Sequence, residues 1–81
     1  MQAFPTVRSV RLEDFRYRQV ASALRDAIAS GELHSGDAVP SAKTLSQDHG
    51  VSMETARKAL RLLASEGVIV RVSAGLPFYV K

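Results

Sequence analysis

Residues 40–67 read PSAKTLSQDHGVSMETARKALRLLASEG and contain two helix starts separated by one sharp turn. Each start places an apolar residue directly before a serine, first at Ser41 and then at Ser52. A serine hydroxyl at this position can accept a hydrogen bond from an amide of the first helical turn that has no partner within the helix. Gly50 lies between the two starts and tolerates the left-handed conformation that ends many helices. The stretch therefore predicts a short helix from Ser41 to about His49, a tight turn, and a second helix that begins at Ser52.

The helix predicted over residues 52–66 has two chemically different faces. Apolar residues recur along it at the helical spacing of a side that packs on a core, and these are Ala56, Ala59, Leu60 and Leu63. The opposite face carries Met53, Glu54, Arg57, Lys58 and Arg61. Arg57 and Arg61 are one helical turn apart, and like charges at this spacing slightly destabilise a helix. Such a cost suggests that the polar face is used for binding.

A longer helix is predicted before this stretch, over residues 14–30. Its apolar residues also repeat at steps of three and four. Asp14 is a suitable N-cap, Gly31 follows the last turn, and Arg25 is expected on a solvated outer face. Residues 1–14 show no sustained period, and we interpret them as an N-terminal arm that is either disordered or packed on a partner.

Strands are predicted on both sides of the two-helix stretch. Pro40 biases the residue before it away from helix, so residues 37–39 are expected to form a very short strand. After the second helix, the runs over residues 68–73 and 78–80 are rich in β-branched and aromatic residues, and Gly75 lies in the connection between them. These runs predict a hairpin with a four-residue tip.

The length of 81 residues is enough for one small domain, to which we assign residues 15–81. The chain has no cysteine, which excludes disulfide bonds and thiolate metal sites and gives no sign of an oxidising compartment. No apolar run approaches the roughly 18 residues of a membrane span, and the N-terminus lacks the apolar segment of a secretion signal. We therefore expect an intracellular protein.

The net charge is +3, and the excess of basic residues lies in the second half of the chain. Up to Pro40, five basic and five acidic residues cancel, whereas six basic and three acidic residues follow it. We expect the second half to face any polyanionic partner.

Three helices followed by a β-hairpin, with a tight turn before the third helix, is the order of a winged helix-turn-helix. The predicted fold class is α+β, mainly α, with the short strand between the first and second helices. In this fold the last helix enters the major groove of DNA, and the hairpin, or wing, reaches toward the backbone or the minor groove.

The run from Tyr17 to Lys81 resembles the DNA-binding domain of the GntR family of bacterial transcription regulators. The matching segments are YRQVASALRDAIASGEL (17–33), GDAVPSAKTLSQDHGVSMETARKALRLLASEGVI (36–69) and a wing built around Gly75. The G-E-L turn, V-P-S, G-V-S and E-G follow one another at the family's distances. This ordered combination makes the resemblance specific.

The resemblance implies DNA contacts at matching positions of the family's motif. Lys43 would reach a phosphate or a guanine. Arg57 would pair with a guanine, a contact that supplies about 1 to 3 kcal/mol of discrimination. Ser52 and Thr55 match the family's serine and threonine at the start of the recognition helix, with Thr55 expected on a phosphate or a base. Gly75 would let the wing backbone approach the groove of the DNA.

Other candidates on the same helix face differ from the family's pattern or have an ordinary alternative role. Where the family commonly has an arginine after the serine, this chain has Met53, which can touch a thymine methyl group but cannot bind phosphate as arginine does. Glu54 repels phosphate unless it accepts a hydrogen bond from a cytosine amine. Lys58 and Arg61 are further candidate contacts, with a solvated surface as the alternative.

The resemblance implies a sequence-specific transcription regulator, a repressor, that binds double-stranded DNA as a homodimer on a two-fold operator. It also implies a cytoplasmic bacterial protein that is associated with the nucleoid when bound and has no membrane partner. The alternative is a winged-helix module for protein interaction or dimerisation, with weak or no DNA binding and a contact surface of Met53, Leu76 and Phe78. The sequence offers no nucleophile with a base and no metal constellation, so we expect neither an enzyme, nor a cofactor, nor a metal site.

Full-length members of the family carry a larger C-terminal domain that binds a metabolite and dimerises. This chain stops at the wing, so we expect either an excised domain or a naturally short member. In both cases we expect no small-molecule effector site within the chain.

Overall fold

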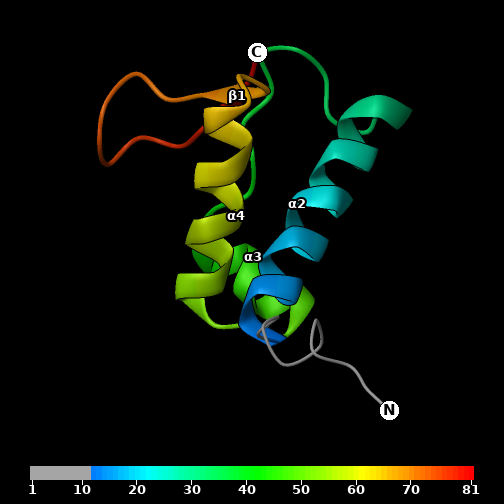
Figure 1. Ribbon diagram of the computed structural model, residues 1–81. Helices are drawn as coiled ribbons and strands as arrows, with labels where there is room; N and C mark the ends of the chain where they lie inside the picture. Colours follow the sequence, from blue (N-terminus) through cyan, green and yellow to red (C-terminus); the bar gives the residue numbers. More distant parts are fainter. Residues whose placement is uncertain (1–11) are drawn as a thin grey trace.

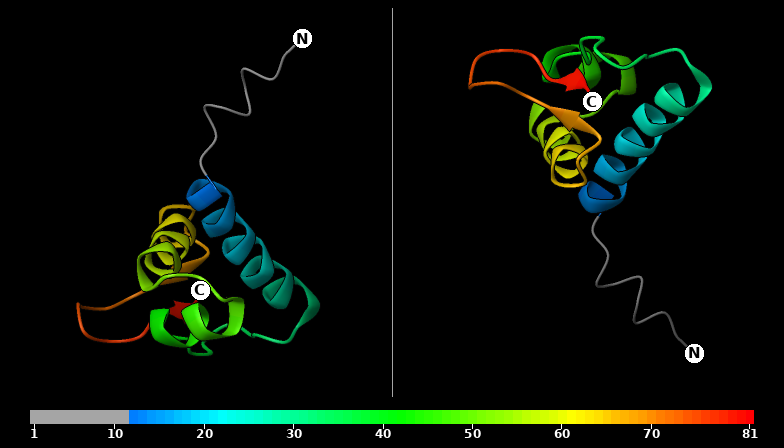
Figure 2. Two further views of the ribbon diagram at one scale, coloured as in Figure 1. Left: turned by 90° about the horizontal axis from the view of Figure 1, so that it is seen from below. Right: turned by 90° about the horizontal axis from the view of Figure 1, so that it is seen from above.

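The computed structural model describes residues 12–81, which form three helices and a two-stranded antiparallel sheet (Figure 1). In chain order the elements are α2 (Leu12–Ser30), α3 (Ala42–His49), α4 (Met53–Ser65), β1 (Ile69–Val70) and β2 (Tyr79–Val80). α4 packs against both α2 and α3. The loop between the two strands projects away from the helices beside α4 (Figure 2). The predicted winged helix-turn-helix is confirmed.

The two serines begin the second and third helices as predicted. Ser41 Oγ and Ser52 Oγ each accept a hydrogen bond from the amide of the third residue of the helix that follows, at 3.2 and 3.1 Å. Gly50 ends α3 with a φ of 65°, in the left-handed region. Gly50 and Ser52, the residues from which the tight turn was predicted, therefore form it in the structure.

The first helix starts earlier than predicted. α2 includes Leu12, so Asp14 lies within the helix, and the predicted cap is wrong. An acidic residue near the start of a helix is stabilised by the positive end of the helix dipole, which accounts for the place of Asp14. Of the predicted arm over residues 1–14, the last three are helical, and residues 1–11 lie outside the described residues.

The hairpin has shorter strands and a longer loop than predicted. Each strand has two residues, with Ile69 opposite Val80. Residues 71–78 join the strands in place of the predicted four-residue tip, and we name them the wing loop. Strands are stabilised by side chains that pack on a half-buried surface, but Val72 is 84% exposed. Because the side chains of the wing loop cover little of the core, the two strands stop pairing after Val70 and Tyr79, where they leave the core.

The short strand predicted over residues 37–39 is present as a single antiparallel bridge between Ala38 and Tyr79. A flanking backbone hydrogen bond runs from the amide of Val80 to the carbonyl of Asp37 at 2.9 Å. β2 therefore pairs with β1 on one edge and with the connection between α2 and α3 on the other.

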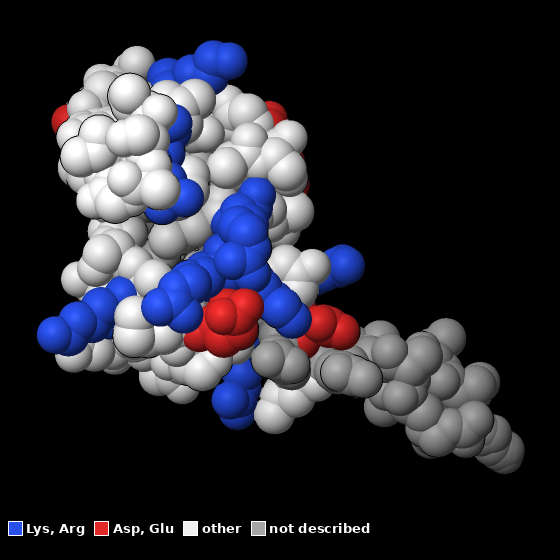
Figure 3. All heavy atoms as spheres, turned by 90° about the vertical axis from the view of Figure 1, so that its left-hand side faces the viewer, with Lys and Arg blue, Asp and Glu red and all other residues white. Residues whose placement is uncertain are grey.

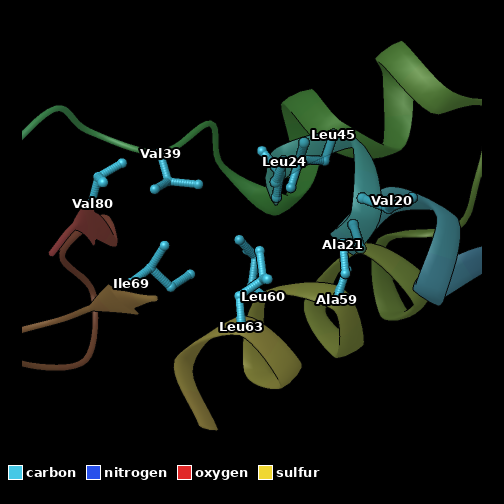
Figure 4. Packing of buried hydrophobic residues seen from close by; sticks show 11 residues of the cluster. Val20, Ala21, Leu24, Val39, Leu45, Ala59, Leu60, Leu63, Ile69 and Val80 are labelled. Atoms are coloured by element: carbon cyan, nitrogen blue, oxygen red, sulfur yellow. The ribbon is translucent and has the colours of Figure 1, made fainter. Parts of the chain in front are cut away.

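The buried core lies between the helices and the sheet (Figure 4). α4 contributes all the apolar residues predicted for its inner face, namely Ala56, Ala59, Leu60 and Leu63. Leu63 is 0% exposed. The other sides of the core include Leu24 of α2, Leu45 of α3 and Ile69 of β1. Because the inner face of α4 is fixed in this way, its opposite face points outward.

An ion pair joins α2 to the end of α4. Arg25 was expected on a solvated face, but its Nη2 atom lies 2.7 Å from Oε2 of Glu66 and its Nε atom 3.1 Å from Oε1. Both side chains are partly exposed, so the pair adds at most about 1 kcal/mol to stability. Its forked geometry orients the two helices more than it stabilises them.

Candidate nucleic-acid interface

A groove runs between α4 and the wing loop, with the start of α3 at its side, and has a volume of about 450 Å³. Three basic side chains line it: Arg57, Arg61 and Arg71. The apolar part of its lining includes Leu60, Leu76 and Phe78. Figure 3 shows basic side chains gathered on this face, around the hollow beside the wing. We call this feature the basic groove. Its charge suits an anionic partner, and phosphates are the commonest source of such charge on a macromolecule.

α4 turns its polar face toward the outside of the domain. Five of its residues are buried on the inner side, namely Thr55, Ala56, Ala59, Leu60 and Leu63. Met53, Arg57 and Arg61 are exposed on the other side. An exposed helix with this chemistry fits the major groove of B-DNA, which is about 12 Å wide and displays the edges of the bases.

Glu54 precedes Arg57 and Arg61 on α4, and its carboxylate pairs with both. Its Oε1 atom is 3.6 Å from Nη1 of Arg57, and its Oε2 atom is 3.1 Å from Nη2 of Arg61. Residues three and seven positions apart lie on the same side of a helix, so the spacing allows this cluster but does not determine which side chains pair. A carboxylate thus bridges two arginines that would otherwise repel each other.

Arg71 is a basic residue of the groove that sequence reasoning did not select. It follows β1 directly, and its Cζ atom lies 4.4 Å from the centre of the Phe78 ring. Stacking on the ring holds the guanidinium and its charge in place. Val70 lies opposite Tyr79 in the hairpin, so Arg71 and Phe78 are the first residues beyond the paired strands on the two sides. The four-residue tip expected from the sequence implies a different register, so it did not predict this contact.

Three other predicted residues are exposed around the groove. Lys43 lies in the first turn of α3, next to Ala42, which lines the groove. Gly75 lies in the wing loop with a φ of 90°, and a Cβ atom there would meet nothing within 4 Å. Met53 is the first residue of α4 and is 40% exposed. Of these three residues, Gly75 also lines the basic groove.

Two predicted contacts lie elsewhere. Thr55 is 3% exposed, and its Oγ1 atom accepts a hydrogen bond from Ser52 Oγ at 2.9 Å. A contact between Thr55 and DNA does not fit this geometry, because the third residue of α4 falls on the side that packs on the core. Lys58 is half-buried, with its Nζ atom 6.0 Å from the centre of the Tyr17 ring of α2. Lys58 therefore lies against α2, outside the basic groove.

Replacing Ser52 by alanine should destabilise the start of α4, because the first turn loses its capping oxygen. The expected cost is about 1 kcal/mol, which lowers the melting temperature of a domain of this size by about 4 to 8 °C. Circular dichroism during thermal unfolding measures the change. Ser52→Thr keeps the accepting oxygen and should melt near the wild type. An unchanged melting temperature for Ser52→Ala would show that the hydroxyl does not stabilise α4.

Among residues 12–81, no helix is both long and apolar enough to cross a membrane. In the same part of the chain, histidine and acidic side chains do not gather in a group of three that could hold a metal ion.

Comparison with known proteins places this sequence among bacterial regulators. The family model described as "Bacterial regulatory proteins, gntR family" matches residues 16–80. The mannosyl-D-glycerate transport/metabolism system repressor MngR of Escherichia coli K12 is 43% identical over 65 residues, which cover 80% of this chain and 27% of MngR. The HTH-type transcriptional regulator GgaR of the same strain is 42% identical over 55 residues, which cover 68% of this chain and 22% of GgaR. The chain spans about a quarter of the length of these curated relatives.

Solved structures with the same architecture include proteins bound to DNA. The structure of AraR(DBD) in complex with operator ORR3 matches with a TM-score of 0.76 and 32% identity, over 82% of this chain and 78% of that one. YtrA from Sulfolobus acidocaldarius, a GntR-family transcription factor, matches with a TM-score of 0.70 and 42% identity, over 80% of this chain and 54% of that one.

Proposed function

This chain belongs to the gntR family of bacterial regulatory proteins, and from this membership we propose that it binds DNA sequence-specifically and regulates transcription as a repressor. A relative with 43% identity is named a repressor, and the DNA-binding domain of AraR, with 32% identity, is named in complex with an operator. The observation in this chain that carries the proposal is the basic groove, in which an exposed helix and the wing loop present three arginines on one side.

In the proposed complex, α4 enters the major groove and the wing loop follows the sugar–phosphate backbone beside it. A buried inner face and an exposed cationic outer face are what this docking requires of a helix. Arg71 stacks on Phe78 at the wall of the basic groove, where its charge can meet a phosphate. Contacts with phosphate set the register of the protein on the duplex but carry no sequence information themselves.

The residues of α4 carry the proposed recognition of sequence. Arg57 is exposed and can donate two hydrogen bonds to O6 and N7 of a guanine. Met53 can contact the methyl group of a thymine from the first position of the helix. Lys43, on the exposed side of α3, would bind phosphate or a guanine, and Gly75 would allow the wing backbone to come close to the DNA.

We propose a homodimer on a two-fold operator, because a symmetric pair of winged helices doubles the contacts on two half-sites. The half-sites would be separated by about one helical turn of DNA, or about 10 base pairs, or a multiple of it. A palindromic sequence recovered by selection from a random duplex pool would support this arrangement.

A module for protein interaction is the second candidate, because the wing loop exposes apolar side chains. Val72 is 84% exposed and Leu76 is 46% exposed. An interface of this kind depends mainly on apolar burial, so salt should change its affinity little. The dependence of binding on salt therefore separates the two functions.

A salt titration of binding to the selected duplex should give a linear loss of log affinity with log salt. If three cations of the groove neutralise phosphates, the slope is about −2.7, and the affinity falls about 40-fold between 50 and 200 mM salt. Fluorescence anisotropy with a labelled duplex measures this slope. Failure of selection to enrich any sequence, together with a slope near zero, would contradict the proposed function.

A further inference from the structure

An acidic residue pairs with two of the three arginines that line the basic groove. Glu54 lies in the first turn of α4, 3.6 Å from Arg57 and 3.1 Å from Arg61 between the charged atoms. Figure 3 shows an acidic patch surrounded by basic side chains on the face with the basic groove. An acid at such a place weakens attraction to every phosphate, so its presence needs a reason other than affinity.

We propose that Glu54 is a specificity-determining residue, which competes with phosphate for Arg57 and Arg61 and so weakens non-specific binding more than binding to the operator. This inference rests on the proposed function in DNA binding. It assigns to Glu54 an effect on the ratio of two affinities, and not a contribution to affinity itself.

The ion pairs of Glu54 can be exchanged for contacts with DNA. The side chains of Glu54, Arg57 and Arg61 are 56%, 49% and 60% exposed, so water screens their attraction. Both arginines therefore have a partner within the protein that a group of the DNA can readily replace. A phosphate that binds one of these guanidinium groups competes with the carboxylate for its N–H donors and brings a second negative charge close to Glu54.

The operator would differ from other sequences by placing a hydrogen-bond donor within reach of the Glu54 carboxylate. Glu54 precedes Arg57 by one helical turn on the same face, so both side chains reach neighbouring base edges. If Arg57 pairs with a guanine, a cytosine amine beside it can donate a hydrogen bond to Glu54. A duplex that does not place an amine donor within reach of Glu54 leaves the carboxylate unpaired near the phosphates, and this cost falls on non-specific complexes.

The test compares wild type, Glu54→Gln and Glu54→Ala in binding to the selected operator and to a poly(dA-dT) duplex. Glu54→Ala checks that any effect comes from the lost charge and not from the new amide. Glu32→Gln removes the same charge from an exposed turn after α2 and is the matched control. Melting temperatures of all variants confirm that each is folded.

We expect both Glu54 variants to bind poly(dA-dT) more tightly, by about tenfold at low salt, because two arginines become free for phosphate. The slope of log affinity against log salt should steepen by about 1 to 2 for this duplex. The ratio of operator affinity to poly(dA-dT) affinity should fall by about tenfold or more. Glu32→Gln should change the ratio little.

Two results would overturn the inference, and they are distinguishable. If wild type binds the operator and the Glu54 variants keep its affinity ratio, Glu54 does not determine specificity while the proposed function stands. If wild type shows no salt-dependent binding to any duplex, the proposed function fails and the inference fails with it. An added Arg61→Ala change should weaken poly(dA-dT) binding more in the Glu54→Gln background than in wild type; equal losses would count against the competition.

Discussion

An Arg57→Ala variant should bind the selected operator about 5- to 150-fold more weakly than wild type, because a bidentate contact with guanine is worth about 1 to 3 kcal/mol. Arg57 is exposed on α4 and lines the basic groove, and Glu54 holds its guanidinium without burying it. Fluorescence anisotropy on the operator and on single-base variants measures the loss. The preference for guanine at the contacted position should disappear in the variant.

Two further variants separate readout from charge. Arg57→Lys keeps the charge but not the planar fork of two donors, so it should lose operator affinity while its binding to non-specific DNA stays near wild type. Arg16→Ala removes an exposed arginine from α2 and serves as the control for net charge. If Arg57→Ala lost no more operator affinity than Arg16→Ala, the assignment of base readout to Arg57 would be wrong.

A Leu63→Ala variant should leave the domain close to the limit of folding. Leu63 is 0% exposed in the core behind the basic groove (Figure 4), and removing a buried leucine costs about 2 to 5 kcal/mol. The whole free energy of unfolding of a chain of 81 residues is about 4 to 12 kcal/mol. Urea unfolding followed by circular dichroism should show a large fall in the midpoint.

Leu62 provides the matched control on the same helix, since the same change is made one residue away. It is half-buried at the edge of the core, so Leu62→Ala should cost clearly less than Leu63→Ala. Equal midpoints for the two variants would contradict the position of Leu63 at the centre of the core.

The helices were predictable because their signals are local. Ser41, Ser52 and Gly50 act on amides and carbonyls within one helical turn, and the apolar spacing of α4 selects its buried face. The extent of the strands was not predictable in this way. Strand pairing stops where the side chains leave the core: residues 71–73 continue the β-rich run after β1, but Val72 is exposed and has no surface to pack on.

The candidate site was predictable as a face of α4 but not in its pairwise contacts. The side of the helix that carries Arg57 and Arg61 followed from periodicity, while the bridging role of Glu54 depends on side-chain conformations that spacing allows but does not determine. The resemblance to the family suggested that Thr55 contacts DNA, although its spacing of four from the buried Ala59 places it on the inner side. Position on the helix outweighs residue type here.

The least predictable contact was the pair of Arg25 and Glu66. The two residues are 41 positions apart in the sequence and meet because α2 and α4 pack side by side. Each one alone has the pattern of a solvated surface residue. Only the packing angle of the two helices brings their charges together.

The bridge of Ala38 to Tyr79 has a consequence for cooperativity. Tyr79 is shared by two pairings, with Val70 on one edge and with Ala38 on the other. Breaking that strand would release the wing loop and the connection between α2 and α3 in a single event, so the two behave as one opening unit. The wing loop, which forms one wall of the basic groove, is thus held by β1 and also by the connection between α2 and α3. Its stability therefore depends on the rest of the domain as well as on α4.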